Sequence, residues 1–111
     1  MSYDLARLDK ECREAIQGAG VKFNGPIELN NRLTRTLGRV MYSHNCIDKI
    51  QFSTQFIENS TDENIREVLL HECSHVVAFL RTHERNGHNS YFKSICAELG
   101  TTNDGTTTHV E

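Results

Sequence analysis

The sequence has no apolar run that approaches the roughly 20 residues needed to cross a membrane, which argues against a membrane-spanning helix. Its first residues lack the basic and then apolar pattern of a secretory signal peptide, so we expect an intracellular protein without a membrane partner. Positive charge is also scarce, since the 111 residues carry a formal net charge of −3. That balance argues against binding nucleic acid through overall charge, although it leaves room for local basic patches.

Cysteine is sparse and is not spaced for a cysteine-rich metal site. The four cysteines, Cys12, Cys46, Cys73 and Cys96, form no C-x-x-C pair, which argues against a zinc ribbon and a dense disulfide framework. We expect reduced and mostly buried thiols, as in an intracellular compartment. The length suits one monomeric domain, which we place at residues 1–100. Residues 101–111 form a polar tail that we expect to be disordered.

The first pattern present in the sequence is helical. Apolar residues recur every three or four positions between residues 5 and 16, and Gly18 then supplies a stop. Three short segments follow with the pattern of strands: residues 27–30, 37–42 and 47–53. Within the second strand, Gly38 marks a bulge or a close approach. The connections look too short for helical crossovers, so we expect antiparallel pairing.

A second helical pattern begins with a capping box, in which Ser60 and Glu63 would satisfy free backbone N–H groups. Its apolar stripe consists of Ile65, Leu69, Cys73, Val76 and Leu80. We expect this helix to end near Arg85, before the breaker Asn86-Gly87, and a last helix to cover residues 90–99. The sequence therefore predicts an α+β fold, with helices packed on a short antiparallel sheet of about three strands.

The motif that carries chemistry is His71-Glu72-Cys73-Ser74-His75, an H-E-x-x-H sequence within the predicted long helix. His71 and His75 lie one turn apart and within about 40° around the helix axis, so both imidazoles can bind one metal ion. Glu72 is turned by about 100° from His71, which keeps it out of the ligand set and near a metal-activated water. This pattern is typical of zinc hydrolases, in which the glutamate is the general base.

A catalytic zinc ion takes three protein ligands and keeps one position open, so a third ligand is needed. His83 would lie about 12 Å beyond His75 on the same helix and be turned by about 80°, so it cannot reach the same ion. His88 is the first choice, because Asn86-Gly87 lets the chain reverse and carry it back over the helix. The alternatives left open are His44, His109 and Glu98.

The sequence resembles the SprT-like family of zinc metalloproteases from about Phe23 to Leu99. The resemblance rests on four segments: residues 31–40, 50–53, 69–75 and 87–92, the last similar to the family's H-G-x-x-F segment. It implies a compact zincin-type domain whose active-site helix carries H-E-x-x-H. It also implies a Zn²⁺ cofactor held by His71, His75 and His88, with Glu72 as the catalytic residue.

Two departures from the family pattern bear on these expectations. The glycine that follows the third histidine in the family is Asn89 here, and we expect Asn89 to keep the turn by adopting a positive φ. Many members carry a cysteine-rich zinc ribbon after the protease domain, and this chain shows none, so it is similar to a minimal bacterial or phage member in the cytoplasm. The resemblance implies hydrolysis of peptide bonds in intracellular proteins, with DNA-bound or DNA-crosslinked proteins as one candidate class.

Two basic patches are candidates for DNA contact: Arg32, Arg35 and Arg39 beside the sheet, or Arg81, Arg85 and Lys93 near the last helix. The alternative function is a non-enzymatic zinc-containing adaptor, or a DNA- or protein-binding module. A fourth protein ligand such as Cys46 or His44 would indicate that alternative, because structural zinc sites are closed by four ligands. For the side chain that stabilises an oxyanion, the sequence offers Tyr42 and Tyr91.

Overall fold

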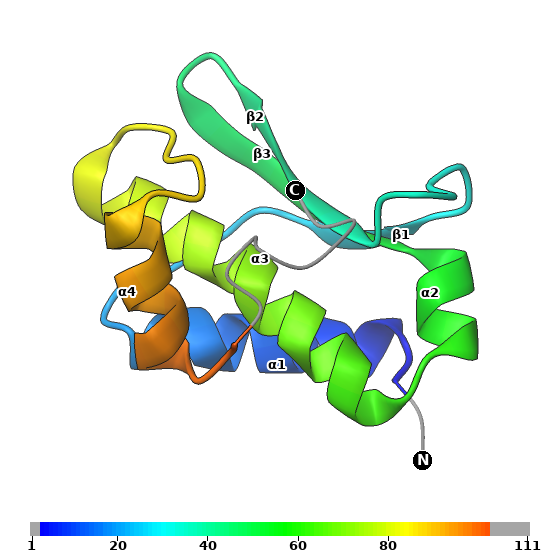
Figure 1. Cartoon of the computed structure of the whole chain (residues 1–111). Helices are drawn as coiled ribbons and strands as arrows, with labels where there is room; N and C mark the ends of the chain where they lie inside the picture. Colours follow the sequence, from blue (N-terminus) through cyan, green and yellow to red (C-terminus); the bar gives the residue numbers. More distant parts are fainter. Residues whose placement is uncertain (1–2, 103–111) are drawn as a thin grey trace.

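The computed structural model describes residues 3–102, which form four helices and a three-stranded sheet (Figure 1). Their order is α1 (Leu5–Gly18), β1 (Ile27–Asn30), β2 (Gly38–Ser43), β3 (Cys46–Ser53), α2 (Thr54–Asn59), α3 (Asp62–Thr82) and α4 (Ser90–Leu99). In Figure 1, α3 runs through the middle of the molecule with the sheet on one side and α1 on the other. The α+β class predicted from the sequence is confirmed.

The sheet has the strand order β1-β3-β2 and its pairing is mixed. β2 and β3 form an antiparallel hairpin, whereas β1 lies parallel to β3, with Asn30 opposite Ser53. The expectation of antiparallel pairing is therefore wrong for β1. Neighbouring strands lie about 4.8 Å apart, so residues 31–37 need to cross only about 10 Å at the end of β3 to reach its far side. The connection between the parallel strands contains β2 itself, and no helix is required.

The central helix α3 carries most of the core. Thr61 caps its first turn by accepting a hydrogen bond from the N–H of Asn64, and every residue from Val68 to Phe79 is buried. A helix buried on all sides needs partners all round, and here α1, α4, β2 and β3 contact α3. The sequence predicted a single apolar face on this helix, and the structure buries the other faces as well. The predicted cap is also displaced by one position, because Ser60 ends α2 instead.

The helices of the structure differ from those predicted from the sequence in two further places. The short helix α2 was not predicted, and it begins where the Ser53 hydroxyl accepts a hydrogen bond from the N–H of Phe56. Helix α3 ends at Thr82 rather than near Arg85, because His83 adopts the left-handed conformation with φ 59°. Helix α4 has the bounds predicted for it, and Gly100 ends it with φ 93°.

The chain after α4 returns to the side of α3. The Thr101 hydroxyl donates to the carbonyl oxygen of Glu67 at 3.1 Å, and the N–H of Thr102 donates to Glu67 Oε1 at 2.9 Å. The rest of the predicted tail, residues 103–111, lies outside the described residues, and so does the alternative ligand His109. Within the described part of the chain, no helix is long and apolar enough to cross a membrane.

Candidate metal centre

Two imidazoles of the candidate site project from one face of α3. His71 is fully buried and His75 is 6% exposed. Their ring centroids lie 5.0 Å apart in an edge-to-face arrangement, as expected for histidines separated by one helical turn. Both rings are fixed by the core around α3, so the site has a rigid base.

The third imidazole comes from the loop between α3 and α4. Nε2 of His88 lies 3.2 Å from Nε2 of His75, and the His88 ring centroid is 4.9 Å from that of His71. One ligand nitrogen from each of these three histidines falls within 4.8 Å of the others. The structure therefore brings together the three histidines that the sequence selected.

Two residues give the loop its course. His83 turns the chain away from α3 in the left-handed conformation, which asparagine and histidine tolerate better than most residues. Asn89 has a φ of −87° and caps α4 by accepting a hydrogen bond from the N–H of Phe92 at 2.9 Å. The expectation of a positive φ at Asn89 is wrong, because the turn after His88 is made by an extended N-cap residue.

The separation of the His75 and His88 ligand nitrogens suits a metal ion. In a tetrahedral site with metal–nitrogen bonds of about 2.05 Å, two imidazole nitrogens lie about 3.3 Å apart. The 3.2 Å between His75 and His88 is close to that value. Imidazole ligands suit zinc, copper, iron and nickel. Within residues 3–102, no fourth histidine, cysteine or carboxylate joins this group, so the described ligands leave a coordination position open.

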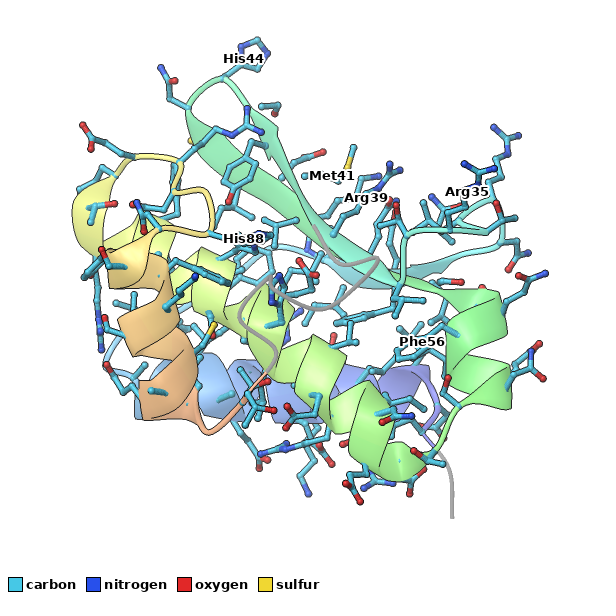
Figure 2. All side chains as sticks on the ribbon, in the orientation of Figure 1. Arg35, Arg39, Met41, His44, Phe56 and His88 are labelled. Carbon is cyan, nitrogen blue, oxygen red and sulfur yellow. The ribbon has the colours of Figure 1, made fainter. Side chains whose placement is uncertain are left out.

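The other ligand candidates from the sequence lie elsewhere. His44 and Cys46 are exposed at the turn between β2 and β3, and Figure 2 shows His44 pointing into solvent far from His88. On α4, Glu98 forms an ion pair with Arg81 at 2.7 Å. His83 is exposed at the end of α3, in agreement with its exclusion on helix geometry.

Phe92 forms a common support for the three imidazoles, which sequence reasoning did not identify. Its ring stacks on His75 with centroids 4.2 Å apart and 24° between the planes. It also contacts His71 and His88, each with a centroid separation of 5.1 Å. The available signal was its position four residues after His88, which places it on the first turn of the following helix.

Glu72 is fully buried on α3, next to the first residue of β2. A Cβ atom on Gly38 would lie 3.2 Å from Cγ of Glu72, 3.1 Å from a ring carbon of Phe52 and 3.3 Å from Cγ1 of Val68. The close approach expected at Gly38 is therefore confirmed, and the absence of a side chain there makes room for Glu72.

A pocket of about 280 Å³ opens beside the histidines. Its lining consists of Val40, Tyr42, His75, Arg85, Asn86, Gly87 and His88. One wall is β2, whose register shifts at Met41 and Tyr42, and the other is the loop between α3 and α4. The guanidinium carbon of Arg85 lies 4.3 Å from the centre of the Tyr42 ring. The pocket therefore connects the candidate metal site to solvent between two separate elements.

The two tyrosines that the sequence offered for an oxyanion differ in position. Tyr42 lines the pocket, whereas Tyr91 is 37% exposed on α4 and does not. Burial raises the pKa of the Tyr42 hydroxyl, with the charge of Arg85 opposing that rise and the charge of Glu72 adding to it. Tyr42 is thus a neutral hydrogen-bond donor at physiological pH.

Comparison with known proteins gives one family match. A family model described as the SprT-like family matches residues 3–111, which include the three histidines, Glu72 and Phe92. Comparison with curated proteins and with solved structures gave no match.

Proposed function

The chain belongs to the SprT-like family, and from that premise we propose that it is a zinc-dependent metallopeptidase that hydrolyses peptide bonds of intracellular proteins. The observation that carries the proposal is the convergence of His71, His75 and His88 at an open pocket, with Glu72 next to His71 on the same helix. Family membership supports a peptidase over hydrolases that act on other bonds.

In this mechanism the three imidazoles hold the ion and Glu72 moves the proton. A zinc ion held there would supply Lewis acidity, which would lower the pKa of water to about 7 and polarise the scissile carbonyl. Glu72 accepts a proton from the attacking water and passes it to the nitrogen of the leaving amine. The burial of Glu72 beside Gly38 restricts the rotamers of its side chain. Of the two tyrosines, Tyr42 is the better placed to donate a hydrogen bond to the developing oxyanion, because it lines the pocket.

The test is the substitution Glu72→Gln in zinc-loaded protein, assayed on a mixture of unfolded protein substrates with zinc content measured in parallel. We expect the wild-type chain to cleave, and the variant to keep zinc while its turnover falls by at least about 10³-fold, the upper part of the range for general acid–base catalysis. Wild-type turnover in the Glu72→Gln variant would rule out this role for Glu72.

The open coordination position favours an enzyme over an adaptor with a structural zinc ion. A structural site takes four protein ligands. The two residues that could have closed the site, His44 and Cys46, lie at the exposed turn of the β2–β3 hairpin. The three buried thiols are consistent with a reducing compartment, and we propose the cytoplasm of a bacterium or of a phage-infected cell.

We also propose that any contact with DNA-bound or DNA-crosslinked substrates involves Arg32, Arg35 and Arg39. Figure 2 shows Arg35 and Arg39 on the side of the sheet away from the helices. In the second patch, Arg81 is engaged by Glu98 and by the carbonyl oxygen of Ala19. In the first patch, Arg39 donates to the neutral Gln51 Oε1 at 2.8 Å, and within the described residues no carboxylate forms an ion pair with its arginines, so more of its positive charge is left for phosphates.

A further inference from the structure

We infer that Arg85 makes the pocket a binding site for a carboxylate, so that the enzyme prefers substrates with an aspartate or glutamate side chain next to the scissile bond. This inference rests on the proposed peptidase function and specifies its substrate class. It is carried by the position of Arg85 in the pocket lining, together with His75 and His88.

The charge of Arg85 is available to a ligand. Within residues 3–102, no carboxylate pairs with Arg85, whereas Arg81, four residues earlier at the end of α3, holds both carboxylate oxygens of Glu98 at 2.9 and 2.7 Å. Arg81 shows the pairing that a guanidinium reaches when a carboxylate lies in range. Arg85 has the same chemistry and faces the pocket instead.

The Tyr42 ring holds the guanidinium in place. The guanidinium carbon lies 4.3 Å from the ring centre, and the ring itself packs against Phe79 with a centroid separation of 5.4 Å. A cation over an aromatic face is attracted by the ring, and the N–H groups at the edge of the guanidinium remain open to acceptors. The contact with Tyr42 favours this position of the exposed Arg85 side chain, which reduces the entropy lost on binding.

The rest of the lining favours an anion over a cation. The lining residues include no aspartate or glutamate, and Val40 and Gly87 are apolar or without a side chain. The amide oxygen of Asn86, which could otherwise accept from a cationic group, already accepts a hydrogen bond from Asn89 Nδ2 at 3.3 Å. An arginine–carboxylate pair is a charge-assisted and frequently bidentate contact. A substrate lysine at the same place would meet repulsion.

The experiment compares cleavage sites in an unbiased peptide library for zinc-loaded wild type, Arg85→Gln and Lys10→Gln. Lys10 is exposed on α1, outside the pocket lining, so Lys10→Gln reports the effect of losing one positive charge elsewhere. We expect wild type and Lys10→Gln to favour glutamate over glutamine about tenfold in kcat/KM at one position flanking the cut. We expect Arg85→Gln to cleave both about equally. Amidated peptides distinguish a side-chain carboxylate from a terminal one.

The outcomes separate this inference from the proposed function. Cleavage without acidic preference, or a preference that survives Arg85→Gln, overturns the inference and leaves the peptidase assignment standing. If the wild type cleaves nothing, the assignment fails, and the inference is decided by binding instead. Zinc-loaded Glu72→Gln is then titrated with a glutamate peptide and its glutamine counterpart while the Gly87 amide is followed by NMR. Equal affinities overturn the inference, and affinity about tenfold higher for the glutamate peptide upholds it.

Discussion

A Cβ atom on Gly38 would lie 3.2 Å from Cγ of Glu72, so β2 and α3 meet at the proposed general base. That separation is tighter than a normal side-chain contact, and the neighbouring Phe52 and Val68 are themselves buried and cannot move freely. Gly38 therefore acts as a positioning residue for Glu72, because its missing side chain leaves room for the Glu72 side chain.

The substitution Gly38→Ala tests this positioning role. We expect kcat to fall by about tenfold because Glu72 must shift, while zinc content stays unchanged because the histidines are not displaced. The added methyl group should also lower the free energy of unfolding by about 1–3 kcal/mol, the usual cost of overpacking. Gly18→Ala is the control, since its Cβ would meet nothing within 4 Å. Wild-type kcat in folded Gly38→Ala protein would contradict the positioning role.

The substitution His88→Ala tests the third ligand. We expect zinc content to fall from about one ion per chain to well below that, since three-ligand sites lose much of their affinity when one ligand is removed. His44→Asn is the matched control, because His44 is exposed with φ 51° and asparagine tolerates that conformation. Full zinc retention in His88→Ala would show that another residue completes the site.

The substitution Phe92→Leu tests the aromatic support beneath the imidazoles. Residues that orient metal ligands typically change affinity by 10- to 100-fold, so we expect about a tenfold weaker zinc affinity in competition with a chelator. Ile95→Val on the same helix is the control, because Ile95 is buried in the core but makes no ring contact with the histidines. If both variants bind zinc like the wild type, Phe92 is only a core residue.

The thiols should differ sharply in reactivity. Cys46 is exposed, whereas Cys12, Cys73 and Cys96 are buried. Burial raises the pKa of the Cys12 thiol, and the neighbouring Cys73 adds to that rise. We expect one fast-reacting thiol in the folded protein at pH 8, absent in Cys46→Ser, and four in denaturant. Fast reaction of a second thiol would show that the core around the buried cysteines opens readily.

The same Cys12 thiol predicts a pH dependence of stability. Its pKa is higher in the folded than in the unfolded chain, so its contribution is complete below the unfolded value and is lost as pH rises towards the folded one. The free energy of unfolding should therefore fall above about pH 9. Denaturant titrations between pH 7 and 10 measure this, and Cys12→Ala should flatten the decline.

Binding to DNA should depend on salt and on the first arginine patch. Each lost phosphate contact reduces the slope of log K against log salt by about 0.9 for duplex DNA. We expect the triple substitution of Arg32, Arg35 and Arg39 to glutamine to weaken binding and flatten that slope. Lys93→Gln should leave both unchanged. The reverse result would move the contact to the second patch.

More of the candidate site than of the sheet pairing could be predicted from the sequence. The ligand spacing within α3 is fixed by helix geometry, so His71 and His75 followed from the sequence alone. His88 followed from the predicted reversal of the chain after α3. The positive φ in this reversal lies at His83, whereas Asn89 is extended and caps α4. Local geometry was sufficient there because all the parts lie within 18 residues of one another.

The sheet pairing depends on contacts that no local pattern records. Parallel pairing of β1 with β3 accompanies the burial of Ile27 and, in part, of Leu29, and the four residues of β1 do not indicate the direction of their partner strand. The pocket was missed for the same reason. Tyr42 and Arg85 lie on separate elements, and only the packing of β2 against the loop brings them together.

The burial of α3 on all sides between Val68 and Phe79 has a consequence for how such a protein can change. A substitution between Val68 and Phe79 disturbs the core and the ligand set together, so these residues have little freedom to vary without loss of the fold. The two borders of the pocket, β2 and the loop after α3, are partly exposed and lie outside that constraint. New substrate preferences can therefore arise at positions such as Val40 and Arg85 while the hydrolytic chemistry stays fixed.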